Sequence, residues 1–173
     1  MKNILVVKAN NRPDGISTKM YEAFMEEIKN VEGYNVSTFD VFAENLTYFG
    51  QDLFNAFGKM QNGEELTAIE QASVDSMNKA RQALSPADIV VFAFPLWNQT
   101  IPAALQSFID YTYGAGYSFK YNEQGQLVSL MTDKKYIVLN ARGGNYSNPA
   151  MNGMEMAVNY INNVIGSVYG MQK

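Results

Sequence analysis

The sequence contains neither cysteine nor histidine. The absence of cysteine excludes a disulfide, a thiolate metal site and a cysteine nucleophile. The absence of histidine excludes a Ser-His-Asp triad, a histidine base and the usual zinc ligand sets, so we expect no metal site. A chain without cysteine suits the reducing cytoplasm, where we expect this protein to be found.

Basic clusters and long apolar runs are also missing. The 13 Lys and Arg face 17 Asp and Glu, which gives a net charge of −4. Because binding to a phosphate backbone needs a clustered basic face, we expect no nucleic-acid partner. No apolar stretch reaches the roughly 20 residues that cross a bilayer, and residues 1–3 lead straight into an apolar run. We therefore expect neither a membrane span nor a signal peptide.

The residues that are present have the composition of a globular protein. Hydrophobic residues make up 47% of the 173 positions, which is ample for a core. The charged fraction of 17% is too low for a disordered chain. We expect residues 1–173 to form one domain.

Apolar runs alternate with amphipathic segments along the chain. This order predicts an α/β fold, a doubly wound parallel sheet with helices on both faces. Residues 45–65 and 114–133 show no clear period and are expected to be irregular insertions. The expected strands are residues 4–7, 34–42, 88–94 and 135–140, and the expected helices are residues 20–28, 67–84, 102–112 and 153–165.

The loop after the first strand, residues 8–19, has the features of a phosphate site. Ser17 and Thr18 supply hydroxyl groups, and the helix that follows presents free N–H groups with about half a positive charge. Arg12 and Lys19 add positive charge. The loop is neither a Walker nor a G-x-G-x-x-G motif, which disfavours a nucleoside triphosphate or a Rossmann dinucleotide. An ordinary helix cap explains this loop, taken alone, equally well.

The loops after the third and fourth strands have the features of a ring-binding site. Pro95 and Pro102 stiffen the first of them, Trp97 offers a flat apolar face, and Asn98 offers a donor and an acceptor. A lone tryptophan is more often a core residue. In the second loop, residues 140–147, paired glycines allow close approach to a ligand. Because right-handed connections bring all three loops to the carboxyl edge of the sheet, together they predict a site for flavin mononucleotide (FMN).

At these residues the sequence resembles the FMN-dependent NADH-azoreductase family, also described as FMN-dependent NADH:quinone oxidoreductases. The motifs that carry the resemblance are VKANNRP, STKMYEAF, FPLWNQTIP, FIDYTYGAGYSFKY and LNARGGNYS. The resemblance covers residues 2 to about 170 and implies a flavodoxin-like fold and a homodimer with active sites at its interface. It also implies ping-pong transfer of two electrons from NADH or NADPH, through the flavin, to a quinone or azo compound.

The resemblance also implies roles for individual residues. No side chain is expected to act as a catalytic acid or base, because the flavin performs the chemistry. A backbone N–H near Asn98 is the candidate donor to N5 of the flavin. The expected substrate wall includes Tyr146, Phe119 and Tyr121. The expected FMN ligands are Asn10, Ser17, Thr18, Lys19, Pro95, Leu96, Trp97, Asn98, Gln99, Ala141, Arg142, Gly143 and Gly144.

The sequence departs from the family pattern after residue 166. Family members continue with a fifth strand and a closing helix, whereas residues 168–173 have room only for the start of that strand. We therefore expect a sheet that lacks the fifth strand and the last helix, with an uncovered edge and face. Two alternatives to the oxidoreductase stay open: a flavodoxin-type carrier of single electrons, and a flavin-binding remnant without activity.

Overall fold

A sheet of four parallel strands forms the centre of the fold. The computed structural model describes all 173 residues. The strands are β1 (Lys2–Lys8), β2 (Tyr34–Asp40), β3 (Ile89–Pro95) and β6 (Lys135–Ala141), in the order β2-β1-β3-β6. This is the flavodoxin-like order. It confirms the predicted doubly wound parallel sheet, which has four strands in this chain.

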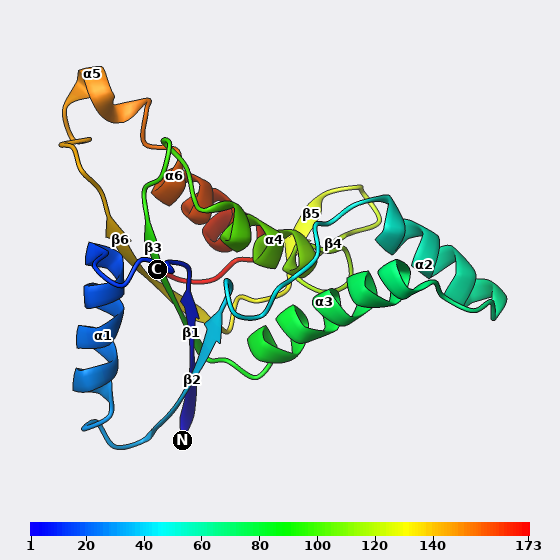
Figure 1. Cartoon of the computed structure of the whole chain (residues 1–173). Helices are drawn as coiled ribbons and strands as arrows, with labels where there is room; N and C mark the ends of the chain where they lie inside the picture. Colours follow the sequence, from blue (N-terminus) through cyan, green and yellow to red (C-terminus); the bar gives the residue numbers. More distant parts are fainter.

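Helices cover both faces of this sheet (Figure 1). Helix α1 (Ile16–Ile28) packs on one face, where it contacts β3 and β6. The opposite face is covered by α3 (Ala68–Leu84), α4 (Ala103–Thr112) and α6 (Ala157–Ile161). None of the helices is both long enough and apolar enough to cross a membrane.

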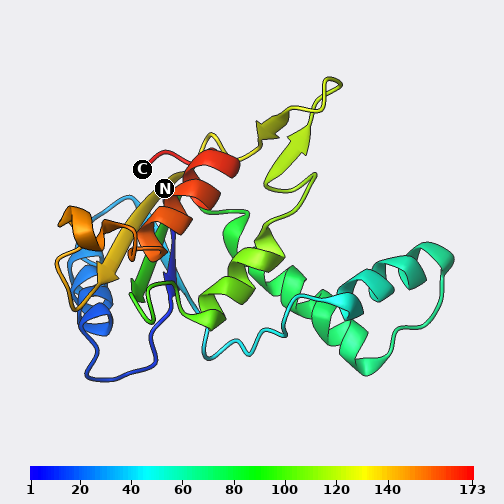
Figure 2. The ribbon, with the colours of Figure 1, turned by 90° about the horizontal axis from the view of Figure 1, so that it is seen from above.

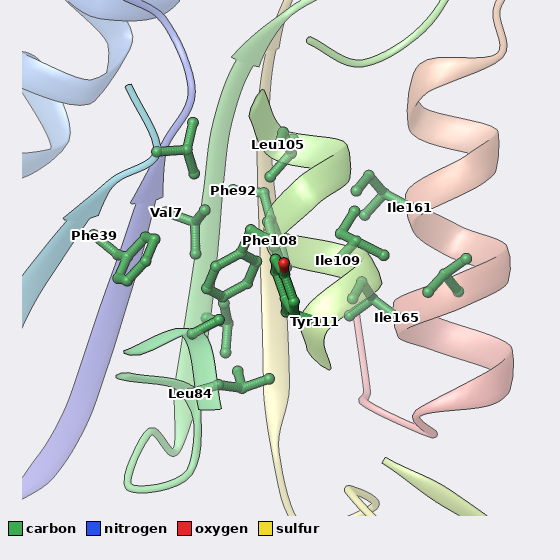
Figure 3. Close-up of a cluster of buried hydrophobic side chains, with 14 of the residues drawn as sticks. Val7, Phe39, Leu84, Phe92, Leu105, Phe108, Ile109, Tyr111, Ile161 and Ile165 are labelled. Carbon is green, nitrogen blue, oxygen red and sulfur yellow. The ribbon is translucent and has the colours of Figure 1, made fainter. Parts of the chain in front are cut away.

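Alternation along the strands divides the core into two parts. On β1, Ile4 and Val6 belong to the small cluster that packs against α1. Leu5 and Val7 belong to the larger core on the other face of the sheet. Phe108 of α4 lies in the larger core with its ring 5.1 Å from that of Phe39 (Figure 3). A strand that is buried on both faces has a continuous apolar run, which explains why β1 and β3 were recognisable.

Residues 45–65, predicted to be irregular, contain helix α2 (Gln51–Asn62), so that prediction was wrong. Figure 2 shows α2 and the far end of α3 projecting from the sheet. Leu53 and Ala56 are buried against α3, but the exposed Phe54 adds an apolar residue to the outer face. Leu53, Ala56 and Met60 recur at helical spacing, so the period was present in the sequence and the prediction overlooked it.

The second predicted insertion, residues 114–133, contains a short antiparallel hairpin of β4 (Phe119–Tyr121) and β5 (Leu127–Ser129). An arginine holds the base of this hairpin. Arg81 of α3 donates from Nε to the carbonyl oxygen of Tyr111 at 3.0 Å, and its guanidinium lies 4.6 Å from the ring centroid of Tyr117. Burial lowers the pKa of Arg81, which has no carboxylate partner.

The last helical segment begins later than predicted, at Ala157 rather than Gly153. The buried Glu155 carboxylate accepts hydrogen bonds from the N–H groups of Val158 and Asn159, which fixes the helix start there. Helix α6 continues as the π-helical segment η1 (Asn162–Val168). A separate short helix, α5 (Pro149–Asn152), precedes α6. Beyond η1, the backbone of Gln172 pairs in parallel with Lys135 at the outer edge of β6.

The predicted capping box at the start of α3 is present and includes an ion pair. Glu70 accepts a hydrogen bond from the Thr67 N–H at 2.7 Å and another from the Lys59 ammonium of α2 at 2.8 Å. The Lys59 hydrogen bond, followed by that from Thr67, lowers the pKa of Glu70 below its usual range. The group therefore links α2 to α3 in its charged form.

This link predicts a pH dependence of folding. An unfolded glutamate titrates near pH 4.3. Because the folded pKa is lower, the stabilisation is present above that pH and is lost as pH falls through the folded pKa. In denaturant titrations from about pH 5 to pH 3, we expect the wild type to lose more unfolding free energy than Glu70→Gln. The exposed control Glu65→Gln is expected to follow the wild type, and parallel curves for all three proteins would contradict the role of Glu70.

Candidate functional site

The three predicted loops meet at the carboxyl edge of the sheet because their strands are neighbours. The Ala9 N–H donates to the carbonyl oxygen of Ala93 at 2.8 Å, which holds the start of the first loop against β3. The Leu96 N–H donates to the carbonyl oxygen of Ala141 at 2.8 Å, which joins the second loop to the third. Backbone pairing thus fixes the relative positions of the three loops.

A cavity of about 480 Å³ lies between these loops. This volume is within the usual range of small-molecule sites, roughly 300–1,000 Å³. All three loops contribute to its lining. The predicted cofactor residues found there are Asn10, Ser17, Pro95, Leu96, Trp97, Ala141, Arg142 and Gly143.

The first loop has hydrogen-bond donors that are free to face the cavity. Asn10 donates from Nδ2 to Ser17 Oγ at 2.7 Å, so the Ser17 hydroxyl hydrogen is free to point at a ligand. Helix α1 has no side-chain cap and no acidic residue in its first turn, so its first N–H groups stay available. A Cβ atom at Gly15 would lie 2.4 Å from Asn10 Nδ2, so a side chain at this position would displace the Asn10 amide.

Two predicted phosphate ligands do not line the cavity. Thr18 is buried, and its hydroxyl donates to the carbonyl oxygen of Arg12 at 2.8 Å, which holds the loop instead. Lys19 is exposed outside the lining. Arg12 does line the cavity, but Asp14 pairs with it at 3.0 Å, and this hydrogen bond lowers the pKa of Asp14. The positive charge at this loop is thus partly neutralised.

The second loop ends in a tight turn with unusual backbone angles. Trp97 and Thr100 exchange two backbone hydrogen bonds around Asn98 and Gln99, whose φ angles are 51° and 71°. Two positive φ values in a two-residue loop are typical of a type I′ turn. The N–H groups of Asn98 and Gln99 make no hydrogen bond within the chain, and the Gln99 carbonyl accepts one from Met156. Asn98 lines a second, adjacent cavity, and Gln99 lines neither.

The third loop brings glycine backbone and one cation to the cavity. A Cβ atom at Gly143 would meet no atom within 4 Å, so the space beside it is open. The Arg142 guanidinium lies 5.9 Å from the ring centroid of Tyr146, which also covers Gly144. Gly144 and Tyr146 contact each other and do not line the cavity.

Asn140 is a lining residue that the sequence reasoning missed. Its Nδ2 donates to the carbonyl oxygen of Phe94 at 3.1 Å, and its Oδ1 is the one buried side-chain polar atom without a hydrogen-bond partner. A buried acceptor that has no partner usually has a functional reason. Its position at the end of β6, beside the predicted loop, was the available signal. Ile16 and Met20 of α1 were also missed as lining residues.

The predicted substrate residues Phe119 and Tyr121 are not brought to either cavity. Phe119 is buried in its own chain, with its ring 5.0 Å from that of Tyr113. Tyr121 lies on the projecting hairpin and is 62% exposed. Neither residue forms part of a binding site within one chain. No cluster of acidic side chains that could hold a metal ion is found either.

Comparison with known proteins agrees with this arrangement. The family model described as a flavodoxin-like fold matches residues 2–173. An FMN-dependent NADH:quinone oxidoreductase from Brevibacillus brevis is 46% identical, with 96% of this chain and 81% of the relative covered. FMN-dependent NADH:quinone oxidoreductase 1 from Bacillus subtilis is 42% identical, with 99% and 83% covered.

Solved structures are similar to the whole chain. A crystal structure of azoreductase from Bacillus anthracis has a TM-score of 0.89 and 43% identity, covering 100% of this chain and 84% of that one. An FMN-dependent NADH-azoreductase from Bacillus anthracis, solved in complex with FMN, has a TM-score of 0.87 and 25% identity, with 99% and 83% covered. The chain therefore belongs to the flavodoxin-like family that contains the FMN-dependent NADH:quinone oxidoreductases.

Proposed function

We propose that this protein is an FMN-dependent oxidoreductase. It takes two electrons from NADH or NADPH and passes them through the flavin to a quinone or an azo compound in a ping-pong reaction. The names of its relatives support this activity. One observation in the structure carries the proposal. The start of α1 with Ser17, the side chain of Trp97 and the backbone of Gly143 all line the same cavity.

The chemistry of the cavity fits FMN. Ser17 and the first turn of α1 are proposed to hold the phosphate, with Asn10 fixing the serine. The unpartnered Asn140 Oδ1 matches an N–H donor, which the flavin ring possesses. The open space at Gly143 lets a planar ring approach the backbone. Gly144, Thr18 and Lys19 are proposed to act through the backbone or from the rim of the site.

The protein's contribution to the reaction is binding and orientation. Bound FMN supplies the redox chemistry, the acceptance of a hydride and its transfer as two electrons. Trp97 presents a flat wall. The N–H groups of Asn98 and Gln99, which make no hydrogen bond within the chain, are proposed to reach a ring nitrogen from the rim of the site. Arg142 places positive charge where negative charge develops on a reduced ring. Pro95 and Leu96 complete the apolar side.

We further propose a cytoplasmic homodimer. The support for association is the exposed apolar surface of α2 and its preceding loop, which includes Phe49, Phe54 and Met60. A second copy would also bring Tyr121, together with Tyr146, near substrate. NADH is an intracellular reductant, and the chain has no cysteine, so both features suit the cytoplasm.

The activity predicts a direct optical test. The purified chain is incubated with FMN, and unbound FMN is removed. The protein is then expected to show flavin absorption, which NADH or NADPH bleaches under anaerobic conditions. Adding a quinone is expected to restore the absorption without further nicotinamide. Bound flavin that neither nicotinamide reduces would indicate an electron carrier instead, and failure to bind FMN would indicate an inactive remnant.

The phosphate role of Ser17 predicts a selective loss of affinity. A hydrogen bond to a charged group contributes about 1.5–3 kcal/mol of binding free energy. Ser17→Ala is therefore expected to weaken FMN binding about ten-fold. Riboflavin has the same ring without the phosphate, so its affinity is expected to stay unchanged. The control Ser37→Ala, on β2, is expected to bind both ligands like the wild type. Equal weakening of FMN and riboflavin by Ser17→Ala would contradict a phosphate contact.

If the protein is a dimer, charged substitutions on α2 are expected to halve its mass in solution. The wild type is expected to sediment at twice the chain mass of 19.3 kDa. The double substitution Phe54→Glu and Met60→Glu places charge on the exposed apolar face and is expected to give folded monomers. Asn55→Glu, on the same helix, adds charge at an exposed polar position and is expected to keep the dimer. A monomeric wild type would contradict the proposal.

A further inference from the structure

Trp97 is the only tryptophan of the chain, and it borders two cavities. The first is the proposed flavin site. The second, of about 680 Å³, is lined by residues of α4, of the loop after β2 and of the turn after β3. A side chain that borders open space in two places has fewer packing contacts to fix its rotamer than a core residue has. The contacts that orient the indole ring are therefore few.

The aromatic ring that pairs with Trp97 is that of Phe42. The two ring centroids lie 6.3 Å apart in an edge-on arrangement, which is within the range of favourable aromatic pairs. Phe42 is half-buried and packs against the larger hydrophobic core. The Phe42 side chain thus connects this core with the ring of Trp97.

A turn that begins at Asp40, the last residue of β2, sets the position of Phe42. The Phe42 N–H donates to Asp40 Oδ1 at 3.1 Å. The next two N–H groups along the chain, those of Ala43 and Glu44, both donate to the Asp40 carbonyl oxygen at 3.0 Å. An aspartate that accepts from the N–H two residues on forms an Asx turn, which fixes the local backbone. The strand expected over residues 34–42 therefore ends at residue 40.

An ion pair holds the Asp40 carboxylate in the orientation that this turn uses. The Lys8 ammonium, at the end of β1, donates to Asp40 Oδ2 at 2.7 Å. The two side chains are 23% and 27% exposed, so the pair is largely sheltered from solvent. Lys8 Nζ also lies 5.6 Å from the ring centroid of Tyr21 on α1. The two carboxylate oxygens thus have separate partners, and Oδ1 stays directed at Phe42.

We propose that Asp40 and Phe42 are positioning residues for the flavin site: Asp40 fixes Phe42, and Phe42 fixes the indole ring of Trp97 before the cofactor binds. This inference rests on the proposed function, because it takes Trp97 as a wall of the flavin site. Neither Asp40 nor Phe42 lines the first cavity, so both act through Trp97. A ring that is already held loses less conformational freedom when a ligand binds, and binding is correspondingly tighter.

The first measurement is the time-resolved fluorescence anisotropy of Trp97 in the FMN-free protein, excited where tyrosine does not absorb. The signal comes from this ring alone, since the chain has no other tryptophan. Phe42→Leu is expected to increase the amplitude of the fast decay, which reports side-chain motion on the picosecond to nanosecond scale. Phe42→Tyr keeps an aromatic ring and is expected to match the wild type. Phe24→Leu, at a half-buried position that lines neither cavity, is the control.

A double substitution tests whether Asp40 acts through Phe42. Asp40→Ala removes the acceptor of the Phe42 N–H and is expected to increase the motion of Trp97 as Phe42→Leu does. The variant that carries both changes is expected to show no more motion than Phe42→Leu alone, because two residues in one chain of contacts are not additive. Asp133→Ala removes an exposed carboxylate that lines neither cavity and is expected to leave Trp97 unchanged.

Two results would overturn the inference at this stage. One is unchanged anisotropy in Phe42→Leu, and the other is an additive effect of the two substitutions. Circular dichroism and the thermal midpoint show which variants are folded. Should Phe42→Leu fail to fold, Asp40→Ala decides by itself, because its side chain lies outside the hydrophobic core.

Ligand affinity shows whether the held ring serves the flavin. Phe42→Leu is expected to weaken FMN and riboflavin equally, about five-fold, which is the cost of ordering one side chain. This pattern differs from that of Ser17→Ala, which is expected to affect FMN alone. Unchanged affinity for riboflavin in Phe42→Leu would contradict a role in positioning the flavin ring.

The proposed function and this inference fail in different ways. A wild type that binds FMN and is reduced by NADH, but whose Trp97 is as rigid in Phe42→Leu as in the wild type, contradicts the positioning role alone. A wild type whose bound flavin is never reduced contradicts the oxidoreductase. In that case the anisotropy of the FMN-free variants still decides whether Asp40 and Phe42 hold Trp97.

Discussion

Parallel pairing of β1 with β3, and of β3 with β6, is the constraint on which the rest of the structure depends. It aligns the ends of three strands that are distant in sequence, so that their loops leave the sheet at one edge. Each loop taken alone has an ordinary structural explanation. Their convergence places a helix start, a stiff turn and a glycine backbone around one cavity.

Trp97 divides this surface into two spaces with different electrostatics. On one side lie a helix start and two arginines, and on the other lie aromatic rings and a single aspartate. Ligands of different charge are therefore favoured on the two sides of one aromatic side chain.

The sequence predicts the elements whose signals are local, and it misses those that depend on neighbours. The capping box at Thr67 and the apolar run of β3 are visible in a few residues, and both were placed correctly. Helix α2 was missed because the glycines and aromatics of residues 45–65 were taken to indicate an irregular segment, although Leu53, Ala56 and Met60 recur at helical spacing. Asn140 was missed because an unpaired acceptor is recognisable only when the surrounding atoms are known. Thr18 fits a phosphate ligand by type, but its hydroxyl is used by its own loop.

The turn at Asn98 and Gln99 has a kinetic consequence. Left-handed backbone at a residue other than glycine costs energy, and two hydrogen bonds between Trp97 and Thr100 hold it in place. The strain is therefore present before any guest arrives. A rim that is already bent into its final shape does not have to rearrange around the ring, so arrival of the nucleotide is expected to be a single encounter step without a slow closing phase.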